Sequence, residues 1–252
     1  MQNAEDIPGE DEMIYGLRPV IEAIRAERPI NKILIQKGMQ KDLFLELKEE
    51  LAKKKYTLQF VPVYKLNKMT RKNHQGVIAI SSPVVYADLE NIVRDLYESG
   101  ELGLFLVLDS ITDVRNFGAI ARTAECLGVH AIVIPEKDSV TVTSDAIKTS
   151  AGALNSIPVC RVRDLSSALH IFKTSGIQVI GCSEKSERPI SKIDFQIPTA
   201  VIVGSEEHGI SARVLADCDK TAKIPLQGKI DSLNVSVAAG MILYEVLRQR
   251  EQ

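Results

Sequence analysis

The hydrophobic and polar positions of the chain follow one pattern before residue 104 and another after it. In the first part, Val20, Ile21 and Ile24 recur at helical spacing, and residues 41–55 form an amphipathic helical pattern. Three short stretches in this part are typical of strands, namely 32–36, 57–63 and 76–81. The residues between the last two stretches are basic and turn-like. Together these segments predict a compact α/β unit.

Beyond residue 104, uninterrupted apolar runs alternate with helical patterns as far as a last helix near the end of the chain. The first of these runs is LFLVLDS at 104–110, and the helical pattern of 116–128 follows it. Runs that are apolar throughout are typical of strands buried on both faces. The alternation therefore predicts an α/β domain with a largely parallel sheet and helices on both faces.

This change of pattern predicts four segments along the chain. Residues 1–12 are acidic and without an apolar core, and we expect them to form a disordered tail. Residues 13–82 form the small α/β unit, residues 83–103 a linker and a helix, and residues 104–252 the parallel-sheet domain.

Ligands of open parallel sheets bind beyond the carboxyl ends of the strands, so polar residues at those ends are candidates for chemistry. After the first strand come Asn116 and Gly118 near a helix start, with Arg122 further along the same helix. A helix start capped by Asn offers free backbone N–H groups to an anion. Taken alone, these residues are better explained by a capped crossover helix with a surface arginine.

Two later strand ends carry comparable polar groups. Gly204, Glu206 and Gly209 follow the strand at 199–203, and their spacing is not the G-x-G-x-x-G dinucleotide fingerprint. Before the last helix, Ile224 and Leu226 close a strand pattern, and Ser232 and Asn234 are candidate helix caps. The small residues Ala238, Ala239 and Gly240 then follow, and we expect backbone to pass unusually close to backbone there.

The basic residues are concentrated in one segment, although the net charge of the whole chain is only −2. Residues 51–80 contain no Asp or Glu, and their basic residues are Lys53, Lys54, Lys55, Lys65, Lys68, Arg71 and Lys72. Tyr56, Phe60 and Tyr64 lie among them. Such a segment suits a polyanion such as RNA. On charge alone, a solvated basic face is an equal alternative.

Other classes of protein are less consistent with the sequence. The longest apolar run, at 102–108, is far shorter than the roughly 20 residues that span a bilayer, and the acidic N-terminus does not match a signal peptide. The four cysteines and four histidines are scattered without metal-ligand spacing. We therefore expect a cytoplasmic protein with reduced thiols, no metal and no membrane partner.

Taken together, the three strand-end motifs resemble, in order and spacing, those of the SpoU/TrmH branch of the SPOUT RNA methyltransferases. The first is matched by Asn116, Gly118 and Arg122, the second by Gly204, Glu206 and Gly209, and the third by SLNVSVA at 232–238. Residues 15–80 resemble the substrate-binding domain of the same family. Phe117 and Asp231 stand where Leu and Ser are common in the family, and neither departure removes a polar group of a motif.

The resemblance implies a C-terminal sheet closed by a deep trefoil knot, a cytoplasmic homodimer formed through the knot helices, and S-adenosyl-L-methionine as the methyl donor. The donor would be held around the residues Gly204, Ile224, Leu226 and Leu233. The residues implied in catalysis are Arg122, Asn116, Glu206, Ser232 and Asn234. For RNA binding, the candidates are Lys53, Lys65, Lys68, Arg71 and Lys72.

The implied reaction is methylation of a ribose 2′-hydroxyl, with a guanosine of 23S ribosomal RNA as the expected target. Since arginine stays protonated in proteins, we expect Arg122 to hold phosphate and to stabilise developing oxyanion charge, with the other polar residues orienting it. Three alternatives stay open: a tRNA 2′-O-methyltransferase, a non-catalytic RNA-binding ribosome-assembly protein, and a nucleotide-dependent dehydrogenase. The absent G-x-G-x-x-G pattern weighs against the last of them.

Overall fold

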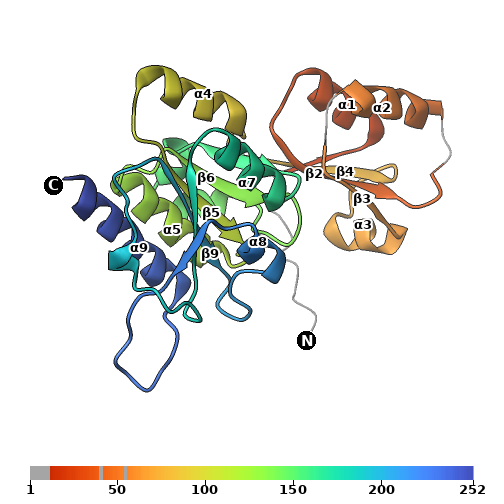
Figure 1. Cartoon of the computed structure of the whole chain (residues 1–252). Helices are drawn as coiled ribbons and strands as arrows, with labels where there is room; N and C mark the ends of the chain where they lie inside the picture. Colours follow the sequence, from red (N-terminus) through yellow and green to blue (C-terminus); the bar gives the residue numbers. More distant parts are fainter. Residues whose placement is uncertain (1–11, 40–41, 54–55, 252) are drawn as a thin grey trace. The chain divides into compact units, whose positions relative to one another are not determined.

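The computed structural model describes residues 12–39, 42–53 and 56–251. Apart from Glu12, the predicted acidic tail lies outside these ranges. The chain divides into two compact units, Met1–Val85 and Tyr86–Gln252, and each is described separately below (Figure 1).

A four-stranded sheet forms the centre of the first unit. Its strands are β1 (Met13–Tyr15), β2 (Ile30–Gln36), β3 (Leu58–Val61) and β4 (Val77–Ser81), in the order β1-β4-β2-β3. β4 pairs antiparallel with β1 and with β2, whereas β3 pairs parallel with β2 and occupies an edge. β1 is an addition to the predicted elements, because three residues are too short to show an alternating pattern.

Helices cover both faces of this sheet. α1 (Leu17–Arg25) and α2 (Asp42–Lys53) pack with Ile33, Ile35 and Val77 on one face, and α3 (Val63–Met69) packs through Leu66 on the other. The sequence pattern predicted a turn where α3 lies. Leu66 is the helix's one fully buried residue, so its apolar positions recur too rarely to show a helical period.

The second unit contains a six-stranded sheet in which every pair of neighbouring strands is parallel. In chain order its strands are β5 (Leu104–Asp109), β6 (Ala131–Pro135), β7 (Val159–Val162), β8 (Gln178–Cys182), β9 (Thr199–Gly204) and β10 (Lys220–Ala222). In space they run β10-β8-β9-β5-β6-β7. The predicted parallel sheet is confirmed, because β5, β6, β8 and β9 are buried almost throughout, as their apolar runs indicated.

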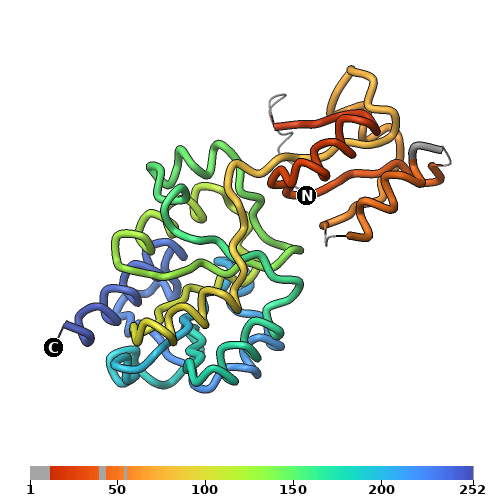
Figure 2. The backbone as a smooth tube through the Cα atoms, turned by 90° about the horizontal axis from the view of Figure 1, so that it is seen from above, coloured from red at the N-terminus to blue at the C-terminus, as the bar shows by residue number. Residues whose placement is uncertain are grey.

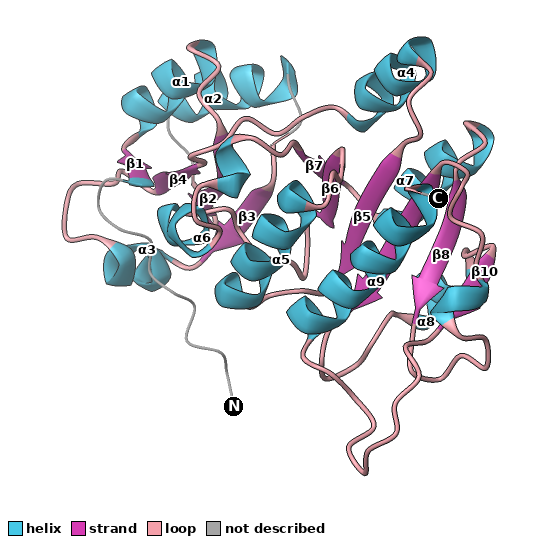
Figure 3. Cartoon of the chain, turned by 90° about the vertical axis from the view of Figure 1, so that its left-hand side faces the viewer, coloured by secondary structure: helices cyan, strands magenta, loops and turns pink. Residues whose placement is uncertain are grey.

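Helices pack on both faces of this sheet as well, as Figure 3 shows. The longer ones are α4 (Leu89–Ser99), α5 (Val114–Cys126), α7 (Leu165–Thr174) and α9 (Val235–Arg250), and the shorter ones are α6 (Ser144–Thr149), α8 (Ala212–Ala216), η2 (Ala153–Asn155) and η3 (Ile190–Lys192). α4, α7 and α8 share one apolar cluster with the sheet. α5 and α9 lie side by side on the other face, although more than 100 residues separate them in the sequence (Figure 2).

The strand order of this unit positions the candidate site. β5 and β9 are neighbours, yet the chain runs from β5 toward β6 and β7 on one side and reaches β8 and β10 on the other. Such a change of direction opens a crevice beyond the carboxyl ends of the two strands.

Ala87 pairs with Cys160 at the β7 edge and Leu89 is buried against the sheet, so α4 is packed into this unit. Across the described ranges, every helix is too short or too polar to span a membrane.

Candidate functional site

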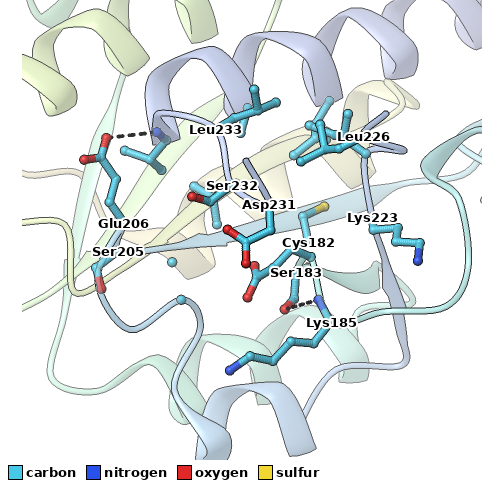
Figure 4. A pocket seen from close by; sticks show the side chains of 18 of the residues that line it. Cys182, Ser183, Lys185, Ser205, Glu206, Lys223, Leu226, Asp231, Ser232 and Leu233 are labelled. Atoms are coloured by element: carbon cyan, nitrogen blue, oxygen red, sulfur yellow. Dashed lines mark hydrogen bonds between the residues drawn. The ribbon is translucent and has the colours of Figure 1, made fainter. Parts of the chain in front are cut away.

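A cavity of about 350 Å³ lies beyond the carboxyl ends of β8, β9 and β10. The loop between β10 and α9, together with the first turn of α9, forms its opposite wall (Figure 4). Gly204, Ile224, Leu226 and Leu233 all line this cavity. The four residues that the sequence predicted around one ligand are therefore brought together, although β10 ends at Ala222 and leaves Ile224 and Leu226 in the loop.

Gly204 allows the turn beside the cavity to close tightly. A Cβ atom on Gly204 would lie 2.0 Å from the carbonyl carbon of Gly209 and 2.2 Å from the amide nitrogen of Ile210. The turn is closed by the amide of Gly209, which donates to the carbonyl of Ser205 at 2.8 Å, and Gly209 has a positive φ of 68°. Glycine is needed at 204 for space and is favoured at 209 for conformation.

Asp109 holds the same turn from the end of β5, and the sequence analysis missed this role. The Asp109 side chain is almost fully buried and accepts hydrogen bonds from the amide of Ser211 at 2.7 Å and from the hydroxyl of Ser110 at 3.1 Å. A buried carboxylate needs such donors. An acidic residue closing an otherwise apolar strand was the signal that could have identified it.

Asn116, Glu206 and Asn234 form a polar cluster at the rim of the crevice. The Asn116 amide donates to Glu206 Oε1 at 3.2 Å, and the Asn234 amide donates to Asn116 Oδ1 at 3.0 Å and also to Glu206 Oε1. The backbone amide of Val235 completes the set with a 3.2 Å bond to the same Glu206 oxygen. One carboxylate oxygen thus joins the starts of α5 and α9 to the turn after β9.

Of the two asparagines, one caps a helix and the other does not. Asn234 is the N-cap of α9, as predicted, and its Oδ1 accepts from the amides of Ser236 and Val237. The prediction that Asn116 caps α5 is wrong, because Asp113 caps that helix and accepts from the amides of Arg115 and Asn116. α5 begins two residues earlier than its apolar pattern indicates, and this leaves the Asn116 side chain free to reach Glu206.

Ser232 and Arg122 lie apart from this cluster. Ser232 lines the cavity, and its side chain has no hydrogen bond within the described part of the chain. Arg122 is exposed on α5, about 9 Å further along the helix axis than Asn116, and it is not among the residues lining the cavity. The described residues give Arg122 no hydrogen-bond or ion-pair partner, so its guanidinium is available to a ligand.

The small residues at the start of α9 have different explanations from the one expected. Ala238 lines the cavity, so a larger side chain there would reduce its volume. Ala239 is fully buried, and a Cβ on Gly240 would meet only the Thr123 side-chain methyl, at 3.4 Å. The expected close passage of backbone by backbone is therefore wrong at Gly240 and occurs instead at Gly204. Gly118 has a similar packing role, since a Cβ there would lie 2.5 Å from Thr149 Cβ.

Cys182 and Ser183 also line the cavity, and the sequence analysis did not select them. Cys182 is the last residue of β8 and Ser183 follows it, so applying the strand-end rule to that strand as well would have found them. Burial raises the pKa of the Cys182 thiol to about 12, with the nearby Cys218 thiol as a smaller cause. At neutral pH Cys182 therefore presents an uncharged surface to the cavity.

The predicted RNA-binding residues divide between the two faces of the first unit. Lys65 and Lys68 lie on α3, and Arg71 and Lys72 on the turn after it. Lys53 lies on α2, which covers the other face, and is paired with Glu50 at 2.7 Å. The Lys72 ammonium lies 5.2 Å from the centre of the Tyr15 ring, a distance at which a cation is attracted to an aromatic face.

The aromatic residues of the basic segment also differ from one another. Phe60 and Tyr64 are exposed, whereas Tyr56 packs against the apolar cluster of α1 and α2.

Across the described ranges, no group of three or more His, Cys, Asp or Glu residues is placed to hold a metal ion.

An open parallel sheet with a cavity at its change of strand direction is typical of enzymes that bind a nucleotide-like ligand. Comparison with protein families gives a more specific assignment of the chain. Residues 103–244 match the SpoU rRNA Methylase family, and residues 13–87 match the family described as RNA 2′-O ribose methyltransferase substrate binding. The chain belongs to the SpoU family of RNA methyltransferases.

Individual relatives agree with this assignment. A TrmH family tRNA/rRNA methyltransferase of Staphylococcus aureus strain MSSA476 is 38% identical over 96% of this chain and 97% of its own. A protein of the same description from Bacillus subtilis strain 168 is 37% identical over 94% of this chain and 95% of its own. The solved SpoU methyltransferase AviRb of Streptomyces viridochromogenes is 27% identical, with a TM-score of 0.61 over 95% of this chain and 89% of its own.

The methyl donor is S-adenosylmethionine, with which AviRb has also been solved as a complex, at 26% identity and a TM-score of 0.60. The residues of the present cavity fit this molecule. Ile224, Leu226 and Leu233 offer apolar surface to an adenine ring, and carboxylates on the cavity wall suit its positive charge. The volume of the cavity lies within the range of small-molecule sites.

Proposed function

We propose that this chain transfers a methyl group from S-adenosylmethionine to the ribose 2′-hydroxyl of a guanosine in 23S ribosomal RNA. The observation that carries the proposal is the junction of the donor cavity with the Asn116–Glu206–Asn234 cluster at one end of the sheet. The choice of a guanosine in large-subunit RNA rests on the motif resemblance, and tRNA is the alternative substrate.

The bound donor supplies an electrophilic methyl group on a positively charged sulfur. The chain must then place the ribose oxygen in line with that methyl group and assist the loss of the hydroxyl proton. The Arg122 guanidinium is unpaired in the described part of the chain, so it suits the RNA phosphate and the developing negative charge on oxygen. Glu206 is a positioning residue, because its Oε1 accepts bonds from Asn116, Asn234 and the amide of Val235.

The test combines a methylation map with a matched pair of variants. Cells lacking this protein should lose ribose methylation at one 23S guanosine, and the wild-type chain should restore it. Arg122→Ala should bind S-adenosylmethionine normally in calorimetry but fail to restore the methylation, whereas Arg94→Ala, on α4, should restore it fully. An unchanged map in the deleted cells would refute the methyltransferase proposal, and a loss confined to tRNA would assign the alternative substrate.

For RNA binding, we propose the basic surface formed by α3 and the turn after it. This surface contains Lys65, Lys68, Arg71 and Lys72, and phosphate contacts by such residues position RNA without reading its sequence. Lys68→Glu should weaken binding to an rRNA fragment about tenfold in a filter assay at low salt, since it removes one phosphate contact and adds a repulsive charge. Lys53→Glu, on the opposite face of the sheet, is the control, and equal weakening by both variants would contradict the assignment.

A homodimer completes the site in this proposal. Ile242 and Val246 of α9 are buried within the chain itself, so they are not free to contact a partner. A second apolar stripe on α9, made of Val237, Met241 and Tyr244, is 47–61% exposed beside α5, the helix that carries Arg122. Met241→Asp should convert a dimer into a monomer in sedimentation experiments, and a wild-type chain that sediments as a monomer would exclude this part of the proposal.

We also propose that the C-terminal segment is threaded into a trefoil knot. The hydrogen bonds of Gln249 and Arg250 to residues 195–197 support this, because they bring the end of the chain beside the loop before β9. Joining the two ends of the full-length chain into a ring tests the idea. After denaturation, the knotted ring should migrate faster in a gel than an unknotted ring of the same length, and equal mobility would rule the knot out.

A further inference from the structure

The walls of the donor cavity carry more acidic than basic side chains. The acidic residues are Glu184, Glu206, Glu207 and Asp231, and the basic ones are Lys185 and Lys223. A cavity with this excess of negative charge favours a cation over a neutral molecule of the same shape. Because the methyl donor and its product differ in charge, the cavity can bind one of them more tightly than the other.

Methyl transfer removes one positive charge from the bound ligand. The methyl group moves from sulfur to the ribose oxygen, the bonding electron pair stays on sulfur, and the hydroxyl proton is released. The ligand thus changes from a sulfonium cation, S-adenosylmethionine, to an uncharged thioether, S-adenosylhomocysteine. Its amino and carboxylate groups are unchanged, so only a side chain close to the sulfur separates the two ligands by charge.

Of the four acidic side chains, Asp231 is best placed to sense this change. Glu206 uses its Oε1 to join Asn116, Asn234 and Val235, and the Glu207 carboxylate lies 3.9 Å from the His208 ring with 85% of its side chain exposed. Asp231 and Glu184 make no hydrogen bond or ion pair within the described part of the chain, and both line the cavity with exposed side chains. Asp231 is the one that directly precedes Ser232 and Leu233, two residues predicted at the reaction site.

The direction of the Asp231 side chain supports the same choice. Figure 4 shows it entering the cavity beside Ser232, on the side of Ser183, which follows β8. Cys182 is uncharged at neutral pH, because burial raises its pKa to about 12. Neither of the two lysines of the cavity, Lys185 and Lys223, forms an ion pair with Asp231 in the described residues, so a ligand cation in the cavity would be its counterion.

We propose that Asp231 selects the methyl donor over the demethylated product by pairing with the ligand's positive charge at sulfur. This inference rests on the proposed function, because it concerns the same cavity. Its consequence is that product release is assisted by the chemistry itself: once the methyl group has left, the attraction between carboxylate and ligand is lost, and the product binds more weakly than the donor.

Calorimetry on the full-length chain tests the proposal with three ligands. They are S-adenosylmethionine, S-adenosylhomocysteine and sinefungin, in which a protonated amine on carbon replaces the methylated sulfonium. Asp231→Asn should weaken the two cationic ligands about fivefold, the scale of a partly solvated ion pair, and change the neutral product less than twofold. Asp231→Glu should keep most of the preference, because it keeps the charge.

Glu207→Gln is the matched control, since it removes the same charge from the rim of the cavity. It should leave the ratio of donor to product affinity unchanged. Equal weakening of all three ligands by Asp231→Asn, or an equal change of the ratio by Glu207→Gln, would overturn the assignment to Asp231. Failure of the wild-type chain to bind S-adenosylmethionine at all would instead count against the proposed function, so the two failures are distinguishable.

Discussion

The carboxyl-terminal and amino-terminal edges of the six-stranded sheet are organised differently, and α9 connects them. At the carboxyl-terminal edge, α9 begins at Asn234 in an exposed polar cluster beside a cavity. At the other edge, α9 ends at Arg250, which donates to the carbonyl groups of Leu102, Gly103, Phe195 and Ile197 at 2.7–3.2 Å.

The two edges differ in whether their polar side chains are hydrogen-bonded within the chain or are free to bind a ligand. Burial lowers the pKa of Arg250, yet four carbonyl oxygens surround its guanidinium and compensate for lost hydration. At the opposite edge, Ser232 and Asp231 have no such partners within the described residues. We conclude that the amino-terminal edge stabilises the fold, whereas the carboxyl-terminal edge is prepared for ligands.

The largest effect is expected from Gly204→Ala at the carboxyl-terminal edge. The new Cβ would overlap the Gly209 backbone at 2.0 Å, so the turn that lines the cavity must move. We expect S-adenosylmethionine binding to fall by about 100-fold, the equivalent of roughly 3 kcal/mol of overpacking. Calorimetry measures this, with Gly228→Ala as the control, because its Cβ would meet no atom closer than 3.9 Å. Normal binding of S-adenosylmethionine by Gly204→Ala would contradict the close approach of the Gly204 and Gly209 backbones.

Arg250→Ala should act on the other edge and change stability instead of binding. Removing the guanidinium leaves four carbonyl groups without this donor, and we expect the free energy of unfolding to fall by roughly 2–4 kcal/mol. Urea denaturation measures that loss, and calorimetry at low temperature should show unchanged affinity of the folded fraction for S-adenosylmethionine. A variant of normal stability but weakened binding would erase the distinction between the two edges.

The smallest effect is expected between the two edges, from Gly240→Ala in the middle of α9. Its Cβ would touch only the Thr123 methyl group at 3.4 Å, and alanine favours the helix over glycine by roughly 0.5–1 kcal/mol. The free energy of unfolding should therefore change by less than about 1 kcal/mol, with activity retained. A loss of several kcal/mol in urea denaturation would show that backbone does pass closely at Gly240.

Much of the second unit could be predicted because its apolar runs and helical patterns are long. The runs of β5 and β9 fall where the sequence placed strands, and the strand-end rule located Gly204 and Glu206 at the cavity. The short elements β1 and α3 could not be predicted in the same way, because three residues, or one buried Leu66, show no period.

Other features depend on contacts between distant residues, which no local pattern encodes. The bond between Asp109 and the amide of Ser211 spans 102 positions, and Asn116 meets Asn234 across 118. The sequence placed small residues at 238–240 but could not show that the close backbone contact lies at Gly204. Asp231 entered the sequence analysis only as a departure from the family pattern, and its place in the cavity required the structure.

Hydrogen exchange with and without S-adenosylmethionine tests most directly whether the two edges have separate tasks. Ligand binding should slow exchange in residues 204–209 and 222–237, which form the cavity and the start of α9. Residues 102–104 and 195–197, which Arg250 holds at the other edge, should exchange at the same rate in both states. Protection centred on the Arg250 edge, or none around Gly204, would contradict the account.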